Sequence, residues 1–155
     1  MSKLVSISII QDDFKLPTPE VLQEQKIAIY DLEQTNFFPL VGFEAYDEIK
    51  LNISLSGNSL VFKISSKTDE TLKTFFLSLT PLKQIINDYY TICESYFNAV
   101  KSLPIDKIES IDMGRKGIHN EGARIIMERL DGRVNTDLET SRRIFTLIYA
   151  LTYER

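Results

Sequence analysis

The fold class is decided by residues 49–79, which read IKLNISLSGNSLVFKISSKTDETLKTFFLSL. Apolar and polar residues alternate over 49–55 and again over 60–64, the two-residue period of a strand with one buried face. Between them, residues 56–58 are Ser-Gly-Asn, which suit the tight turn of a hairpin. Residues 72–79 form a third run of strand character. We therefore predict three consecutive antiparallel strands, a meander.

A fourth strand and a helix are predicted before the meander. Alternating apolar residues predict a strand over 4–10. A turn at 15–19 follows, in which Thr18 can cap a helix whose first residue is Pro19. Apolar residues at helical spacing continue this helix to residue 34, where Gln-Thr-Asn suggests its end. Which edge of the sheet the N-terminal strand takes is not readable from the sequence.

Helices dominate the chain after the meander. Thr80 followed by Pro81 is a cap-then-first-turn signal for a helix over the next twenty residues. That helix contains the run DYYTICESYFNAV at 88–100, with aromatic residues at helical spacing. These aromatic side chains could line a pocket or a partner surface. Core packing is the preferred interpretation, because tyrosine commonly buries its ring and leaves the hydroxyl wet.

Three shorter helices are predicted towards the C-terminus. Pro104 can open one over 104–111, and Asn120 can cap another over 121–130. Thr136 with Glu139 three residues later fits a capping box for the last helix. This last helix has apolar residues on one face: Leu138, Phe145, Ile148 and Leu151.

Strands first and helices later indicate an α+β protein. We expect an antiparallel sheet, made of the three-stranded meander plus the N-terminal strand, with one early helix and a C-terminal helical half packed on it. No repeat or linker divides the 155 residues, so residues 1–155 are expected to form one domain.

The composition excludes several kinds of site. The chain has one cysteine, Cys93, and one histidine, His119. These two residues cannot form an internal disulfide, nor a Cys/His zinc site within one chain. The adjacent acids Asp12 and Asp13 lack the ligand spacing of a calcium loop, so we treat them as solvated. No metal and no cofactor is expected.

Charge and hydropathy bear on location and partners. The chain has 43% hydrophobic and 26% charged residues and a net charge of −4, so the balance argues against a nucleic-acid partner. Its apolar runs are far shorter than the ~20 residues of a membrane helix. The first ten residues alternate instead of forming a secretory signal. We expect a soluble, cytoplasmic protein that does not associate with membranes.

The segment IDMGRKGIHNEG, residues 111–122, concentrates reactive side chains. If its glycines form a turn before a helix N-terminus, the free N–H groups there can bind an anion, with Arg115, Lys116, Gly117 and Asn120 as ligand-binding candidates. His119 is a candidate for acid–base catalysis together with Glu121. The segment lacks the spacing of a phosphate-binding P-loop and of a dinucleotide fingerprint.

The same residues also fit a purely structural role. The glycines can end helices, Asn120 can be only a cap, and Glu121 and Arg124 have the spacing of an exposed ion pair. Cys93 is interpreted as a buried small apolar residue, because no basic neighbour is evident to activate it.

Arginine is unevenly distributed, since all seven arginines lie at or after Arg115. Arg142 and Arg143 lie near the start of the last helix, where positive charge opposes the helix dipole unless it is paired. Asp137, Glu139 or an external anion can pair with them, so both arginines are further ligand-binding candidates.

Four stretches together resemble a known family. They are LSLTP at 77–81, DYYTICESYFNAV at 88–100, IDMGRKGIHNEG at 111–122 and SRRIFTLI at 141–148. The chain resembles the uncharacterised protein family 0262, a set of bacterial proteins of similar length, along nearly its whole length. The resemblance implies a bacterial, cytoplasmic protein and no assigned activity, so no catalytic or binding residue is transferred from it.

The function itself is not specified by the sequence, and two hypotheses are preferred. The first is a non-enzymatic binding or assembly module that self-associates or docks a protein partner through the aromatic helical half. The second is a small enzyme or ligand-binding protein for a metabolite that carries phosphate or carboxylate, using residues 111–122. The second requires Arg115, His119 and Glu121 to converge on one pocket. Nucleic-acid binding is a third option that requires the basic residues of the C-terminal half to share one face.

Overall fold

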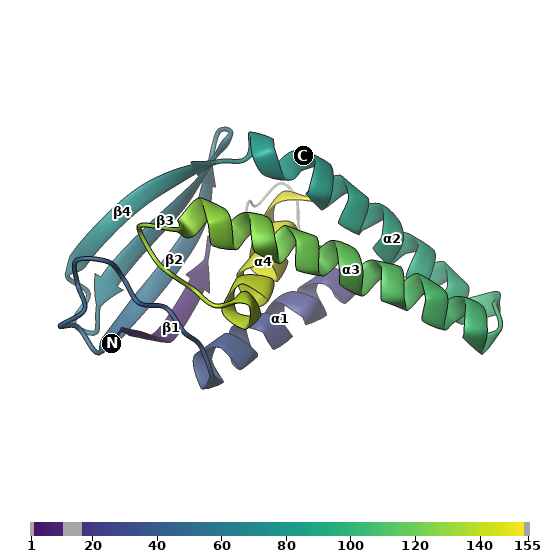
Figure 1. The fold of residues 1–155 in the computed structure, drawn as a ribbon, viewed down its shortest axis with the longest axis horizontal. Coiled ribbons are helices and arrows are strands. Elements are labelled where there is room, and N and C mark those ends of the chain that lie inside the picture. The colour runs from purple at the N-terminus through teal and green to yellow at the C-terminus, as the bar shows by residue number, and fades with distance from the viewer. Residues whose placement is uncertain (1, 11–16, 154–155) are drawn as a thin grey trace.

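The computed structural model describes residues 2–10 and 17–153, in which four strands and four α-helices follow one another along the chain (Figure 1). The elements are β1 (Lys3–Ile9), α1 (Pro19–Gln34), β2 (Glu48–Ser56), β3 (Ser59–Ser66), β4 (Thr71–Ser78), the 3₁₀ turn η1 (Thr80–Leu82), α2 (Lys83–Ser102), α3 (Ile105–Leu130) and α4 (Leu138–Thr152). The predicted turn at 15–19 lies partly outside the described residues, and the pair Asp12 and Asp13 lies wholly outside them. The α+β class is confirmed.

The strands form one sheet in the order β1-β2-β3-β4. Strands β2, β3 and β4 pair antiparallel, which confirms the meander. The turn between β2 and β3 contains Gly57 with φ of +59°, a backbone conformation that favours glycine.

The expectation of a purely antiparallel sheet was wrong, because β1 pairs with β2 in parallel, with Ile7 opposite Leu51. Alternation of apolar residues is the same for either strand direction, so the sequence pattern could not distinguish them. The connection that decides the direction is α1, which carries the chain across so that β2 starts beside the start of β1.

One side chain secures β1 to the end of α1. Asn36 Oδ1 accepts a hydrogen bond of 3.0 Å from the backbone N–H of Leu4, and Asn36 Nδ2 donates to the backbone oxygens of Leu4 (2.8 Å) and Leu32 (2.7 Å). The side-chain amide of Asn36 therefore satisfies both the N–H and the C=O of Leu4, as an adjacent strand would. Leu4 lies next to the point where the register with β2 shifts.

The start and end of α1 follow the prediction. The Thr18 hydroxyl accepts a hydrogen bond of 3.3 Å from the backbone N–H of Val21, Pro19 is the first helical residue, and the helix ends at Gln34. A capping hydroxyl followed by a proline, which has no N–H that needs a partner, starts a helix through local interactions. The succession Thr18-Pro19 can therefore be recognised in the sequence.

Two predicted caps were wrong. Thr80 to Leu82 form a 3₁₀ turn, and α2 starts after it at Lys83 with no side-chain cap among the described residues. At α4 the cap is Asp137, whose Oδ1 accepts from the backbone N–H of Thr140 at 2.8 Å. Thr136 is instead buried, 2.7 Å from the hydroxyl of Ser141. Adjacent residues of similar capping ability compete, and burial decides which one faces the helix end.

The largest correction concerns residues 104–130. The prediction of two helices separated by a glycine-containing turn is wrong, because α3 is one continuous helix in which Gly114 and Gly117 are interior residues and Asn120 is not a cap. Two of its glycines face neighbouring helices: a Cβ on Gly114 would lie 2.9 Å from Ile92, and one on Gly122 would lie 2.5 Å from the ring of Phe145. The glycines of α3 therefore permit close helix packing at two points.

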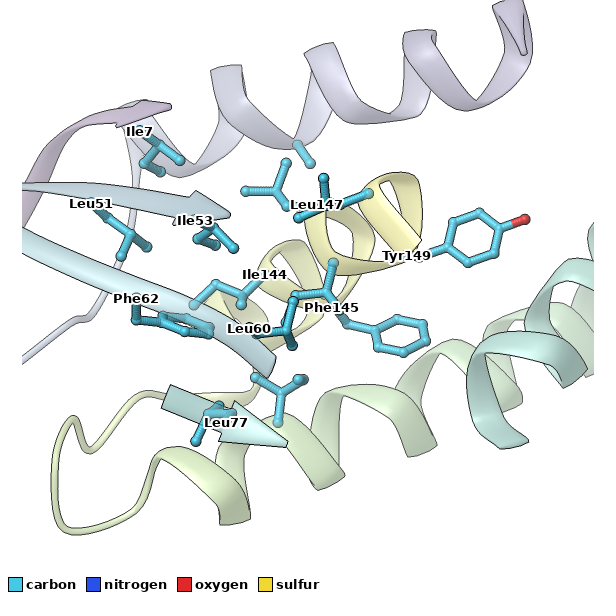
Figure 2. Packing of buried hydrophobic residues seen from close by; sticks show 14 of the residues in the cluster. Ile7, Leu51, Ile53, Leu60, Phe62, Leu77, Ile144, Phe145, Leu147 and Tyr149 are labelled. Atoms are coloured by element: carbon cyan, nitrogen blue, oxygen red, sulfur yellow. The ribbon is translucent and has the colours of Figure 1, made fainter. Parts of the chain in front are cut away.

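The core is built around α4. Figure 2 shows Ile144 of α4 beside the sheet residues Ile53 and Leu60, Leu147 on the side that faces α1, and Phe145 extending towards α3. Residues 144–151 are all buried. The prediction of a single apolar face was thus too narrow, because this part of α4 lies between the sheet, α1 and α3, and a helix segment enclosed by neighbours is buried all round. The start of the helix differs, since Glu139 is exposed and Arg142 and Arg143 are only half-buried.

The helical half is not one layer on the sheet. Helices α2 and α3 pack against each other and extend away from the sheet, with the turn between them at the far end (Figure 1). Across the described residues, none of the helices combines the length and the apolar character needed to cross a membrane.

Candidate functional site

Four helices contribute side chains to one pocket with a volume of about 290 Å³. We call it the α1–α3–α4 pocket. Its lining residues are Glu24, Ile27, Ala28 and Asp31 from α1, Tyr89 from α2, Arg115, Lys116 and His119 from α3, and Glu139, Arg142, Arg143 and Thr146 from α4. This volume corresponds to roughly ten water molecules, so the pocket suits a small metabolite.

Helical spacing explains how each helix presents its residues. The lining residues of α1 and of α4 both follow the spacing i, i+3, i+4 and i+7, which places them on one face of each helix. On α3, Arg115 and His119 are four residues apart and therefore lie on the same face. The continuity of α3 thus brings together two candidates that the predicted turn would have placed independently.

His119 lies at the centre of a polar and aromatic cluster. Its Nε2 atom is 2.8 Å from the hydroxyl of Thr146, which is also 3.2 Å from the backbone oxygen of Arg142. Its ring lies 5.2 Å from that of Tyr89 and 5.4 Å from that of Phe145. If the Thr146 hydroxyl donates to Arg142, then Nε2 carries the proton and Nδ1 is left as a lone pair.

The surroundings keep His119 uncharged at neutral pH. Burial, followed by the positive charges of Arg142 and Arg115, lowers the pKa of His119 from 6.5 to about 4. Glu139 acts in the opposite direction but does not offset these effects. With Nε2 bonded to Thr146, the neutral imidazole can accept one hydrogen bond from a ligand at Nδ1 without adding charge to the pocket.

On α3, the two basic side chains share one carboxylate. Arg115 donates to Asp112 Oδ1 at 2.7 and 3.0 Å, and Lys116 Nζ lies 3.2 Å from Asp112 Oδ2. The Arg115 guanidinium also lies 5.0 Å from the centre of the Tyr96 ring. Asp112 lies outside the pocket lining, so it orients Arg115 without occupying the pocket.

On α4, Arg142 and Arg143 are both paired with Glu139. Arg142 Nη1 donates to Glu139 Oε1 at 3.0 Å, and Arg143 Nη1 lies 3.5 Å from Glu139 Oε2. Arg143 also lies 3.8 Å from Asp31 of α1. The prediction that acids of the same helix pair with these arginines is confirmed for Glu139, whereas Asp137 serves as the helix cap.

Three buried polar atoms of the pocket residues have no hydrogen-bond partner among the residues that the structure describes. They are Glu24 Oε2, His119 Nδ1 and Arg142 Nε. A buried polar atom without a partner costs about 1 to 3 kcal/mol, and native proteins contain few of them. Their concentration around one pocket is a property expected of a binding or catalytic site.

Glu24 is the most unusual acid in the pocket. Burial raises the pKa of its carboxyl above the ordinary value, although the nearby charge of Arg115 acts to lower it. Burial also raises the pKa of Tyr89, so its hydroxyl keeps its proton. Sequence reasoning missed Glu24, because an acid in an amphipathic helix is ordinary. It considered a pocket-lining role for the aromatic run that contains Tyr89, but preferred core packing. The one available signal was the spacing of Glu24 and Asp31, which places them on a shared face of α1.

Not all predicted site residues meet. The structure brings together Arg115, Lys116, His119, Arg142 and Arg143, whereas Glu121, Gly117 and Asn120 do not line the pocket. Glu121 is exposed and lies 3.3 Å from Arg124, the ion pair expected from their spacing. Of the three residues required to converge, Arg115 and His119 line the pocket and Glu121 does not. Glu121 is two residues after His119, and residues two apart on a helix point in different directions.

Two further predictions concern α2. Cys93 is buried, as expected, and burial raises the pKa of its thiol to about 12, which makes it a poor nucleophile. Tyr89 is buried in the core, and Tyr90 and Phe97 pack against it, which confirms core packing for these three residues. Tyr89 also lines the pocket, and Tyr96 lies outside the core, under the guanidinium of Arg115. Among the described residues, no group of three or more His, Cys, Asp or Glu side chains has an arrangement that could hold a metal ion.

Comparisons with known proteins agree with the resemblance found in the sequence. A family model described as "Uncharacterised protein family (UPF0262)" matches residues 1–154. The chain is 48% identical to a UPF0262 protein of Dinoroseobacter shibae over 157 residues, covering 99% of each chain. It is 47% identical to one of Ruegeria pomeroyi, covering 99% of this chain and 98% of the relative.

The names of these bacterial relatives state no activity. None of the solved structures matches the chain. The match over nearly the whole chain shows that this protein belongs to the uncharacterised family UPF0262.

Proposed function

We propose that the protein binds a small anionic metabolite in the α1–α3–α4 pocket. The observation that supports this is the convergence of Arg115, Lys116, Arg142 and Arg143 with the uncharged His119 on one pocket. Guanidinium groups bind carboxylate and phosphate through paired N–H donors. The buried Nε of Arg142, which has no partner among the described residues, is a donor that such an anion can occupy.

A thermal-shift screen tests this proposal. A ligand at a hundred times its Kd should raise the free energy of unfolding by about 2.7 kcal/mol, which corresponds to roughly 5 to 10 °C in Tm for a chain of this size. The screen uses carboxylated and phosphorylated metabolites of about 15 non-hydrogen atoms or fewer, the size that fits the pocket. At least one of them is expected to raise the Tm of the wild-type protein.

Two arginine variants distinguish ligand binding in the pocket from ligand binding elsewhere on the protein surface. Arg142→Ala removes the buried Nε donor from the pocket and should abolish the ligand-induced shift in Tm. Arg124→Ala is the matched control, because Arg124 is exposed on α3 and pairs with Glu121 away from the pocket. The proposal would be contradicted if no compound stabilised the protein, or if both variants responded to the ligand like the wild type.

The second candidate is an assembly module. The aromatic residues on which that hypothesis was based are largely internal, but three apolar side chains at the turn between α2 and α3 are exposed: Val100 (53%), Leu103 (45%) and Ile105 (73%). This turn lies at the end of the helix pair that is farthest from the sheet (Figure 1). Exposed apolar side chains that cluster in this way are common at protein interfaces.

Sedimentation measures whether this surface supports self-association. The wild-type protein is expected to show a mass that rises with concentration, and Ile105→Glu should shift it towards the monomer, because a charge in an apolar interface is unfavourable. Met113→Glu, another exposed apolar residue but one within α3, is the control. A mass that stays monomeric at all concentrations would remove this candidate.

A further inference from the structure

We infer that the ligand of the α1–α3–α4 pocket is a small zwitterion, in which a carboxylate is held by Arg142 and Arg143 and an ammonium group by Glu24. The inference rests on the proposed function and narrows it from anions in general to compounds that carry one charge of each sign. Three properties of the pocket support it: its charge balance, the separation of its two polar ends and the state of Glu24.

The charges around the pocket balance. Four basic and three acidic side chains line it, and the Asp112 carboxylate just outside contacts both Arg115 and Lys116. His119 adds no charge at neutral pH. A polyanion such as a nucleotide loses its hydration on binding, and the pocket has no excess of positive charge to offset that loss. A ligand with one positive and one negative charge does not need such an excess.

The pocket has two polar ends. Helices α1 and α4 run antiparallel, because Thr18 at the start of α1 bonds to Tyr153 and Phe37 beyond its end bonds to Thr140. Asp31 therefore lies beside Arg143 and Glu139, while Glu24 lies seven residues away along α1, about 10 Å by the rise of a helix. The apolar side chains of Ile27 and Ala28 line the pocket between these ends.

Glu24 differs from the other acids of the pocket. Asp31 and Glu139 each form an ion pair with an arginine of α4. Glu24 has no ion pair within 4.0 Å among the described residues, although the charge of Arg115 acts on it from farther away, and its Oε2 atom is buried without a hydrogen bond. Burial of an unpaired carboxylate is unfavourable unless a cation or a donor completes it. An ammonium group of a ligand supplies both a positive charge and three N–H donors.

Matched pairs of compounds test the inference by isothermal titration calorimetry. Each pair has the same carbon chain with and without an amino group: glycine and acetate, β-alanine and propionate, γ-aminobutyrate and butyrate, glutamate and glutarate. Phosphate and ATP are included as anions without an ammonium group. In at least one pair the amino compound is expected to bind about tenfold or more tightly than its partner, since a hydrogen bond between two charged groups is stronger than one between neutral groups.

Two variants on α1 identify the residue responsible. Glu24→Gln keeps the shape of the side chain but removes its charge, so the preference for the amino compound should fall to about twofold or less. Glu20→Gln, an exposed acid of the same helix outside the pocket, should keep the preference. Circular dichroism of both variants checks that they fold. The comparison of each amino compound with its partner is made on the wild-type protein, so it does not depend on the folding of a variant.

The outcomes separate this inference from the proposed function. If the plain carboxylates or phosphate bound as tightly as the amino compounds, the zwitterion would be overturned and anion binding in the pocket would stand. If the amino preference survived in Glu24→Gln, the assignment of Glu24 would be overturned. If none of the acids, amino acids or phosphates bound, the proposed function would fall together with the inference.

Discussion

Replacing Gly122 with alanine should lower the free energy of unfolding by roughly 1 to 3 kcal/mol, the usual cost of overpacking a core. A Cβ at this position would lie 2.5 Å from the ring of Phe145, which is fully buried between α3 and α4. Either the ring must leave its place in the core or the two helices must separate. The gain of about 1 kcal/mol that alanine normally brings to a helix offsets this cost only in part.

Gly117→Ala is the matched control for this prediction. Gly117 belongs to the same helix and is exposed, and a methyl group added at its Cα would meet no atom of the described residues outside its own helix within 4 Å. Alanine there should therefore raise the free energy of unfolding by roughly 0.5 to 1 kcal/mol. Urea unfolding curves of both variants give the comparison, and equal effects of the same sign would show that α3 and α4 do not meet at Gly122.

Lowering the pH from 7 to 4.5 should destabilise the wild-type protein by up to roughly 3 kcal/mol more than His119→Gln. The pKa of His119 is about 4 in the folded protein and near its ordinary value of 6.5 when unfolded. The unfolded chain therefore takes up a proton first as the pH falls. The stability due to neutral His119 is fully present above pH 6.5 and is lost progressively between 6.5 and about 4.

The comparison with His119→Gln isolates this residue. It is the only histidine in the chain, and glutamine can keep a hydrogen bond to Thr146. Glu24 has the opposite dependence, because its raised pKa makes the folded state gain stability as the pH falls, but both proteins retain it. Urea unfolding at pH 7, 5.5 and 4.5 is the measurement, and two parallel stability curves would contradict the buried, neutral state of His119.

Errors in the predicted site came from reading glycine as a local signal. The prediction places Gly114 and Gly117 in a turn that exposes N–H groups to an anion, yet both lie inside α3. Each glycine costs a helix about 1 kcal/mol relative to alanine, which packing against α2 and α4 can easily offset. Had the segment been taken as helical, its spacing would have placed Arg115 and His119 on one face and Glu121 on another.

The features that depend on neighbours along the chain could be predicted from the amino-acid sequence. These are the alternation that forms the meander, the turn at Gly57, the Thr18 cap of α1 and the membership of UPF0262. The three structural features depend on residues a few positions apart, whose energetics are nearly the same in any fold.

The parallel pairing of β1, the burial of residues 144–151 of α4 and the composition of the pocket depend instead on contacts between distant parts of the chain. Glu24, Tyr89, His119 and Arg142 are separated by up to 118 positions in the chain, so no local pattern relates them. They meet because α4 is enclosed by α1, α3 and the sheet, and it is this burial that lowers the pKa of His119 and raises that of Glu24.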